Sequence, residues 1–311
     1  MKRFSPLLTL LLTLALFPLP AQEVTTPQEY LRRYNSLVQR VGADGVGVET
    51  LLNKWEVTYP EDVQQKLARF QFCFERSRTP RVIQLDRDRY LGREPILPMT
   101  DSLGRKCNYF QDVLFDDDLF AAALQALDKA IASRPDRLDY RMLRADALLA
   151  YGKEEPDMAL QELKALADRH YRQKPIWEYE GLDSVDDARF QAFLQDYCAA
   201  IFRIGSDASA EAFRSLSEHL LAYDKDNPLF LDNLGSYYLV KKNYKTARKY
   251  FDQVLKKHPG DMTALRNGLL LARSVKDRKL ETRYLALMAE HGETETDRES
   301  ARIRLQAYRQ K

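Results

Sequence analysis

The sequence predicts an all-α solenoid, built from helical hairpins, that carries a small β-hairpin insertion. Apolar residues recur at helical spacing through most of the 311 residues. Two small residues, Gly235 and Ala247, stand inside neighbouring helical patterns, where closely packed helices would need them. Short runs with β-branched and aromatic residues, cut by Pro and Gly, interrupt the helical pattern in residues 79–115.

Residues 1–21 have the composition of a secretory signal peptide. A basic start, MKRF, precedes the apolar run Leu7–Phe17, and Ala21 lies where a signal peptidase would cut. The apolar run is too short to span a bilayer comfortably. We therefore expect an exported protein, in the periplasm or outside the cell, that begins near Gln22. No cysteine follows Ala21, so we do not expect a lipid-anchored N-terminus.

The predicted mature chain carries no net charge. Loss of Lys2 and Arg3 with the signal peptide leaves 46 of the 48 basic side chains, which equals the number of acidic ones. A nucleic-acid-binding surface needs a positive field, so we expect no nucleic-acid partner. No second apolar run is long enough for a transmembrane helix, so membrane association is expected only through a partner.

Residues 22–78 are predicted to form an N-terminal helical region without a recognisable repeat signature. The first helix begins with a capping pattern, in which Glu29 follows Thr26 by three positions. A second helix is expected from Val48, after the break GADGVG. A third is expected from Pro60, because Pro is favoured in the first turn of a helix.

Residues 79–115 are predicted to be a β-hairpin insertion in, or cover over, the helical chain. The segment DSLG has Asp first and Gly fourth, as in a type I turn, so we expect a hairpin from Ile96 to Phe110. Cys107 lies in this hairpin and could form a disulfide with Cys73 in an exported protein. The alternative is that Cys73, Cys107 and Cys198 are small apolar side chains.

Residues 116–292 are predicted to be a helical-repeat array, and residues 293–311 a C-terminal capping helix. Asp116–Asp118 precedes the first helix of the array. Acidic residues at a helix start cap free N–H groups more often than they bind a metal.

One hairpin in this array, Leu231–Pro259, has a specific signature. It has the spacing L-G-x2-Y, then A-x3-F, then Pro, on Leu234, Gly235, Tyr238, Ala247, Phe251 and Pro259. This spacing resembles the tetratricopeptide repeat (TPR), which has a period of 34 residues. Gly in a helix interior costs about 0.5–1 kcal/mol relative to Ala, and close approach of the two helices would explain it. Together with the signal peptide, the chain also resembles secreted TPR proteins of Gram-negative bacteria.

Weaker copies of the repeat flank this hairpin. The second-helix spacing recurs at Ala123, Leu127, Ala130 and Pro135, where the insertion stands in place of a first helix. Further pairs are expected in 145–166, 185–228 and 262–292. Stacks of three or more are expected because one hairpin cannot bury both of its faces.

The TPR resemblance implies a concave groove, lined by the first helix of each repeat, that holds a peptide or a partner helix. The groove positions of the best repeat fall on Leu229, Asp232, Ser236, Leu239 and Val240. One TPR subgroup clamps a C-terminal carboxylate with Lys and Asn at two of these positions. Here they are Asp232 and Ser236, so we do not expect that clamp. In the next repeat, Arg266 and Arg273 would point the same way.

No motif in the sequence indicates catalysis, a cofactor or a metal site. The chain has no P-loop, G-x-S-x-G or G-x-G-x-x-G pattern, and no H-E-x-x-H pair among His170, His219, His258 and His291. We therefore expect a non-catalytic interaction or scaffold module of the cell envelope, whose partner is another protein or a peptide. One alternative is a small-ligand or glycan-binding protein, like helical-repeat nutrient-binding lipoproteins, for which a cluster of aromatic residues would be expected. A hydrolase is a further, less favoured alternative.

Overall fold

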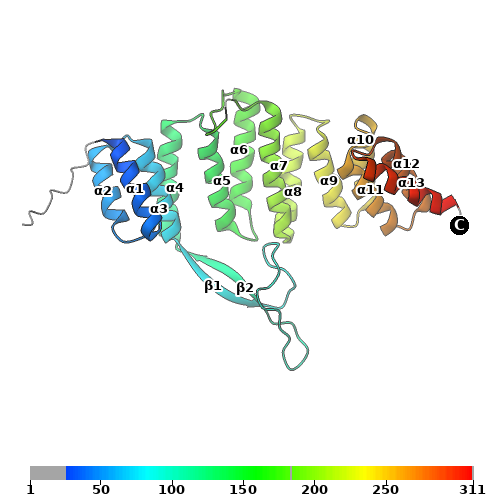
Figure 1. Cartoon of the computed structure of the whole chain (residues 1–311), viewed down its shortest axis with the longest axis horizontal. Helices are drawn as coiled ribbons and strands as arrows, with labels where there is room; N and C mark the ends of the chain where they lie inside the picture. The colour runs from blue at the N-terminus through cyan, green and yellow to red at the C-terminus, as the bar shows by residue number, and fades with distance from the viewer. Residues whose placement is uncertain (1–25, 183, 310–311) are drawn as a thin grey trace, which may run out of the picture.

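The computed structural model describes residues 26–182 and 184–309, and within them it contains thirteen helices and one two-stranded sheet. The helices stand side by side in one curved row, and the β-hairpin extends from one edge of it (Figure 1). The fold class, a helical-hairpin solenoid with a small β insertion, is confirmed. The predicted signal peptide lies outside the described residues.

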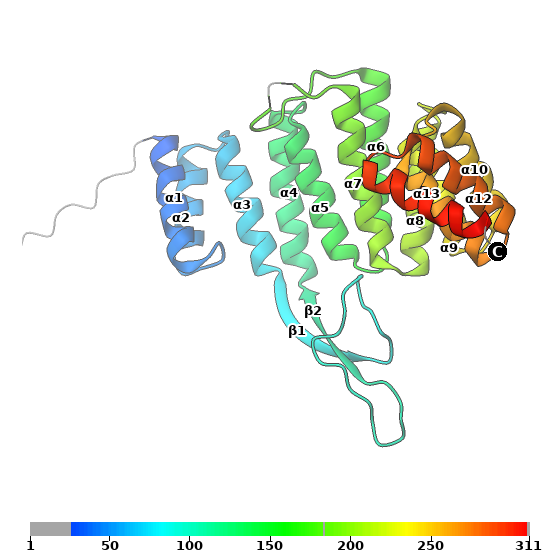
Figure 2. The same cartoon turned by 45° about the vertical axis from the view of Figure 1, so that its right-hand side comes forward.

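Successive helices pack as antiparallel hairpins, α1–α2 through α11–α12, and α13 packs on α12 as a single last helix (Figures 1 and 2). The strands are β1 (Arg78–Leu85) and β2 (Asn108–Phe115). The helices are α1 (Pro27–Val41), α2 (Val48–Thr58), α3 (Val63–Arg76), α4 (Asp117–Ser133), α5 (Leu138–Gly152), α6 (Asp157–Gln173), α7 (Asp187–Ile204), α8 (Asp207–Leu221), α9 (Pro228–Val240), α10 (Tyr244–Lys257), α11 (Met262–Ser274), α12 (Arg278–His291) and α13 (Glu295–Arg309).

Several helices begin at a small polar side chain that accepts a bond from a free N–H group of the first turn. Thr26 caps α1 in this way through the N–H of Glu29. Asp116 caps α4, because its Oδ1 accepts a 2.9 Å bond from the N–H of Leu119. The predicted capping role of this acidic residue is therefore confirmed.

The crossing of α9 and α10 explains the two small residues of the best repeat. A Cβ atom added to Gly235 would lie 2.3 Å from Cε1 of Phe251, so only Gly fits there. Ala247 and Phe251 are fully buried. The same crossing recurs between α11 and α12, where a Cβ on Gly268 would lie 2.8 Å from the ring of Tyr284. The sequence pattern did not identify this second glycine, although its position relative to the aromatic ring is the same.

The insertion is a longer hairpin than predicted. β1 pairs with β2 in antiparallel register, from Arg78 opposite Phe115 to Leu85 opposite Asn108. The predicted hairpin from Ile96 to Phe110 is present in part. Its turn is closed by a 3.0 Å bond from the N–H of Gly104 to the carbonyl oxygen of Asp101, and antiparallel bridges join Leu97 to Tyr109 and Thr100 to Lys106. Residues 96–100 form no continuous strand, because they contain a proline at 98 and follow one at 95, and a proline has no N–H to donate to a ladder.

The hairpin also lies elsewhere in the repeat than expected. α3 packs against α4 as the other hairpin partners do, and Asp116 N donates a 2.8 Å bond to Ser77 O at the base of the strands. The expectation that the first helix before Ala123 is missing is therefore wrong, since α3 is that helix. Residues 77–116 replace the short turn of a helical hairpin.

All three cysteines are free. Cys73 is buried in α3, whereas Cys107 directly precedes β2, at the end of the hairpin far from α3. Eight strand residues at about 3.3 Å each place Cys107 roughly 25 Å from the hairpin base. Disulfide-bonded cysteines need Cα atoms within about 7 Å of each other, so this chain does not form the Cys73–Cys107 disulfide in this structure.

Candidate functional site

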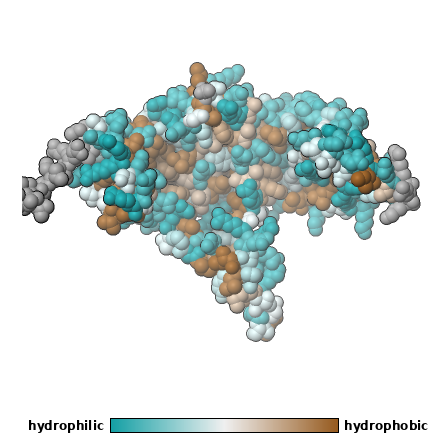
Figure 3. All heavy atoms as spheres, in the orientation of Figure 1, coloured by the Kyte–Doolittle hydropathy of each residue, from teal (hydrophilic) through white to brown (hydrophobic). Residues whose placement is uncertain are grey.

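A hollow of about 730 Å³ lies on the face formed by α1, α3 and α5, and we call it the groove. In the space-filling view, apolar side chains gather in a recess in the N-terminal half of the row (Figure 3). The apolar lining of the groove consists mainly of Leu31, Leu67, Phe70, Phe74, Met142 and Leu143. Helices α1, α3 and α5 are the first helices of three successive hairpins. The TPR resemblance assigns the binding groove to helices in this position.

The groove combines this apolar lining with polar side chains at its α5 side. Asp146 accepts a 2.7 Å bond from the hydroxyl of Tyr197 on α7. Partial desolvation raises the pKa of Asp146, against the opposing effect of that hydrogen bond. Asp139 and Glu180 lie nearby, and Arg137 pairs with both of them. An amphipathic segment could therefore place apolar side chains in the groove and a donor group at Asp146.

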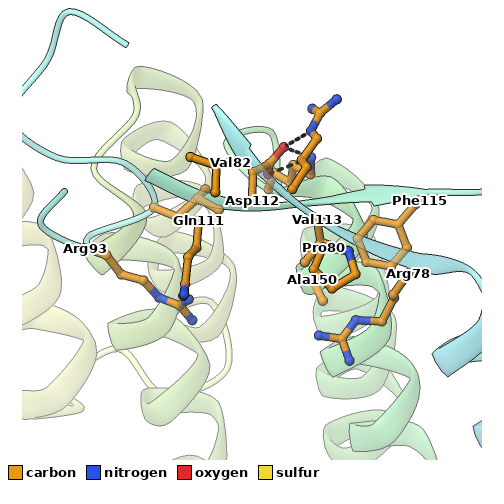
Figure 4. Close-up of a pocket in the computed structure, with 12 residues that line it drawn as sticks. Arg78, Pro80, Val82, Arg93, Gln111, Asp112, Val113, Phe115 and Ala150 are labelled. Atoms are coloured by element: carbon orange, nitrogen blue, oxygen red, sulfur yellow. Dashed lines mark hydrogen bonds and ion pairs between the residues drawn. The ribbon is translucent and has the colours of Figure 1, made fainter. Parts of the chain in front are cut away.

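A second hollow, of about 560 Å³, lies between the β-hairpin and α5, and we call it the hairpin pocket. It shares Arg78 and Ala150 with the groove, so the two hollows meet. Alternate residues of a strand point to one face, and one face of this sheet lines the pocket (Figure 4). That face carries Arg78, Pro80, Val82, Gln111, Val113 and Phe115.

Asp112 points to the other face of the sheet and ties the hairpin to the solenoid. Its carboxylate accepts bonds from Arg81 Nε (2.7 Å), the hydroxyl of Tyr90 (3.0 Å) and Lys153 Nζ (2.9 and 3.1 Å). Burial alone would raise the pKa of Asp112, but the hydrogen bonds from Lys153, Arg81 and Tyr90 outweigh it and lower the pKa to about 2. Since Lys153 directly follows α5, this cluster fixes the hairpin against the helices.

Two more contacts hold the loop of the hairpin. Arg87 makes two bonds to Glu154, of 2.6 and 2.9 Å, in the turn between α5 and α6. Gly92 lies against the end of α7, because a Cβ there would come within 2.3 Å of the carbonyl oxygen of Arg203. The hairpin is thus attached to two successive helical hairpins, and the pocket is preformed.

The residues predicted on α9 do not form a comparable hollow. Asp232, which was expected to face the groove, is only 4% exposed. The pKa of Asp232 is raised to about 9. Burial is the larger cause, and the neighbouring carboxylate of Asp261 is the second. Ser236 accepts a 3.1 Å bond from Asn267 on α11. This helix uses its polar side chains for packing against its neighbours.

The remaining three predicted groove residues lie at the surface of α9. Leu229 and Val240 are exposed, whereas Leu239 is half-buried. Their part in binding stays a prediction.

Arg266 and Arg273 share one face, as the register predicts. Both line a smaller hollow of about 330 Å³ between α11 and α13. Arg266 pairs with Asp297 at 3.2 Å, and Arg273 pairs with Glu281 at 2.8 Å. These cations are therefore neutralised within the chain.

The part of the chain that the structure describes contains no group of three or more His, Cys, Asp or Glu side chains that could hold a metal ion. His170 is a packing residue, because its Nδ1 accepts a 3.1 Å bond from Trp177 and its ring stacks on Phe190. Trp55 and Trp177 are both buried, so neither offers an open surface for a sugar ring. Among the described helices, none has the length and apolar character of a membrane span.

Fold and groove together define a class, a TPR-like helical solenoid with a preformed cleft. No family model matches the chain, and no curated protein matches it. Among solved structures, pilF of Pseudomonas aeruginosa aligns over 89% of this chain and 96% of its own, with 12% identity and a TM-score of 0.34. The flexible tandem repeat domain of a bacterial cellulose synthase aligns over 92% and 99%, with 16% identity and a TM-score of 0.29. TM-scores this low carry no argument about a shared site or partner, so the assignment rests on the chain's own helices and crossings.

Proposed function

We propose that this chain is a non-catalytic interaction module that holds a peptide or helix of a protein partner in the groove of α1, α3 and α5. The observation that carries the proposal is the groove itself, with an apolar lining, polar groups at one side and a continuation onto the hairpin. Binding sites for peptides typically combine an apolar cleft with a few placed polar groups.

Filling the groove tests the proposal without assuming the charge of the partner. Asn35 on α1 and Gln64 on α3 are exposed residues that line the groove. The double variant Asn35→Trp with Gln64→Trp should retain the fold and lose the protein that the wild type captures from the envelope fraction. Gln161→Trp, at an exposed position on α6 outside the three hollows described above, is the matched control. Equal capture by all three proteins, compared by mass spectrometry, would place binding elsewhere.

We also propose that the chain is exported and reaches a membrane only through its partner. The basic start, the apolar run and Ala21 support this. N-terminal sequencing of the mature protein should find Gln22 first. An intact Met1, or a purely cytoplasmic pool, would contradict export.

A further inference from the structure

We infer that the hairpin pocket binds an acidic, extended segment of the partner, with carboxylates at Arg78 and Arg93 and apolar side chains over Val82 and Val113. The inference rests on the proposed function, because the segment is taken to belong to the protein that occupies the groove.

The charges that line the pocket favour an acidic ligand. The residues that line it include four cationic ones and one acidic one, and two of those cations, Arg81 and Lys153, bind the carboxylate of the acidic residue, Asp112, on the other face of the sheet. Arg93 forms no ion pair with any residue of 26–182 or 184–309. Arg78 pairs only with Glu75, three residues earlier, and an exposed pair of this kind contributes little. Within the described part of the chain, the Arg93 guanidinium is therefore open to a carboxylate, and the Arg78 guanidinium is held only by an exposed pair that a ligand carboxylate can replace.

The geometry places these two groups on either side of an apolar surface. Figure 4 shows Arg93, Gln111 and Arg78 extending to the same side of the sheet, with Pro80 and Val113 on that side too. Asp112 lies on the opposite side. An arginine side chain can bind a carboxylate through two parallel hydrogen bonds, so the pocket offers two anchors for carboxylates and an apolar centre.

The alternation of side chains along the hairpin favours an extended segment over a helix. Side chains of an extended chain alternate between two sides, so one side can carry both carboxylates and small apolar groups. Val82 is 58% exposed in the unbound chain, and a covering segment would remove it from water. The attachments of the hairpin at Lys153 and Glu154 reduce the ordering that binding would require.

The pocket also continues the groove. Arg78 and Ala150 line both hollows, so one polypeptide can pass from the groove onto the hairpin. The groove side bears Asp139, Asp146 and Glu180, whereas the lining of the hairpin pocket has four cationic residues and a single acidic one. This difference in charge gives a bound chain a preferred direction.

A pair of charge-matched peptides tests the inference on the full chain. A short fluorescein-labelled peptide of alternating Glu and Val should bind in fluorescence anisotropy, and the corresponding Lys and Val peptide should not. Arg93→Glu should weaken binding of the Glu-Val peptide at least tenfold, which corresponds to about 1.4 kcal/mol, and Arg93→Ala should weaken it less. Arg89→Glu is the matched control, because Arg89 is an exposed hairpin residue outside this pocket, and it should bind like the wild type.

Two results would overturn the inference. One is equal binding of the Glu-Val peptide by wild type and Arg93→Glu. The other is failure of the peptide to bind while phosphatidylglycerol vesicles bind in an Arg93-dependent way, which would identify a lipid surface instead. The groove variant Asn35→Trp with Gln64→Trp separates the two proposals. If that variant loses the partner while Arg93→Glu captures it as well as the wild type, the groove proposal stands and the acidic-segment inference fails.

Discussion

At the scale of single residues, the most informative side chain is Asp232, a buried acidic group where the repeat pattern predicts a groove position. One of its oxygens has no hydrogen-bond partner, and the other bonds to the carboxyl group of Asp261. Two carboxyl groups can share a hydrogen bond only if one of them holds a proton. Folding therefore favours the protonated form of Asp232.

Asp232→Asn should lose less stability than the wild type as the pH rises. The folded pKa of about 9 lies above the ordinary value of 3.8, so the folded state binds more protons between these two pH values. Stability contributed by protonated Asp232 is present below about pH 4 and is lost as the pH rises towards 9. Between pH 5 and pH 8, the free energy of unfolding measured in urea should fall by at least about 1 kcal/mol in the wild type. It should not show this fall in the variant.

Asp44→Asn is the control for this comparison. Asp44 is exposed in the turn before α2, so its variant should follow the wild type across the same pH range. Parallel curves for wild type and Asp232→Asn would contradict the protonated state of Asp232.

The sequence could predict the roles of some single residues and not of others. Gly235 and Phe251 were identifiable because their spacing is local to one hairpin. The burial of Asp232 was not, because its partner Asp261 belongs to the next hairpin and depends on how the repeats stack. A groove position in one repeat can thus become a packing position when the neighbouring helix supplies a partner.

At the scale of elements, the crossing of α9 and α10 gives a test in which two effects have opposite signs. In an exposed helix, Gly→Ala stabilises by about 1 kcal/mol through helix propensity. At Gly235 the added Cβ meets the Phe251 ring, so Gly235→Ala should destabilise instead, by about 1–3 kcal/mol as overpacking typically does.

The exposed Lys245→Ala on α10 is the matched control and should change the unfolding free energy by no more than about 0.5 kcal/mol. The comparison needs only urea melts of the three proteins. A Gly235→Ala variant as stable as the wild type would mean that the helices are further apart than described.

The β-hairpin makes a second prediction at this scale. Asp112→Asn should loosen the strands of the hairpin from α5, because Asn cannot form ion pairs with Lys153 and Arg81. The pKa of Asp112 is about 2 when folded, below the ordinary 3.8, so its contribution is present above about pH 4 and is lost as the pH falls through 2. At neutral pH, amide hydrogen exchange in β1 and β2 should accelerate in the variant, by roughly tenfold or more.

The amides of α9 and α10 serve as the internal reference, since they are remote from the hairpin. Equal acceleration in both regions would point to global destabilisation, and no acceleration in β1 would contradict the role of Asp112 as a tether.

The sequence indicated that an insertion exists but not how it is built. Its β-branched runs, turn residues and prolines can each be recognised in the sequence. The pairing of β1 with β2 was not, because it joins residues separated by the whole loop from 86 to 107. The helix α3 carries no repeat signature, so its partnership with α4 across the insertion had no local signal either.

At the scale of the whole molecule, the two halves of the solenoid use their first helices differently. In the C-terminal half, polar and charged groups on this face bond to one another, as Ser236 does with Asn267 and Arg266 with Asp297. In the N-terminal half they leave an open groove that continues onto the hairpin. The clearest repeat signature therefore marks a tightly packed hairpin, and the candidate site lies where that signature is weak.

Site-specific photocrosslinking in cells tests this central claim most directly. A photoreactive amino acid at Gln64, in the groove, should give a covalent adduct with the partner, and the same group at Val240 on α9 should give none. Both positions are exposed on first helices of the solenoid, so the comparison separates the open groove from the packed half. An adduct at Val240 with none at Gln64 would contradict the account and move the binding surface to the C-terminal repeats.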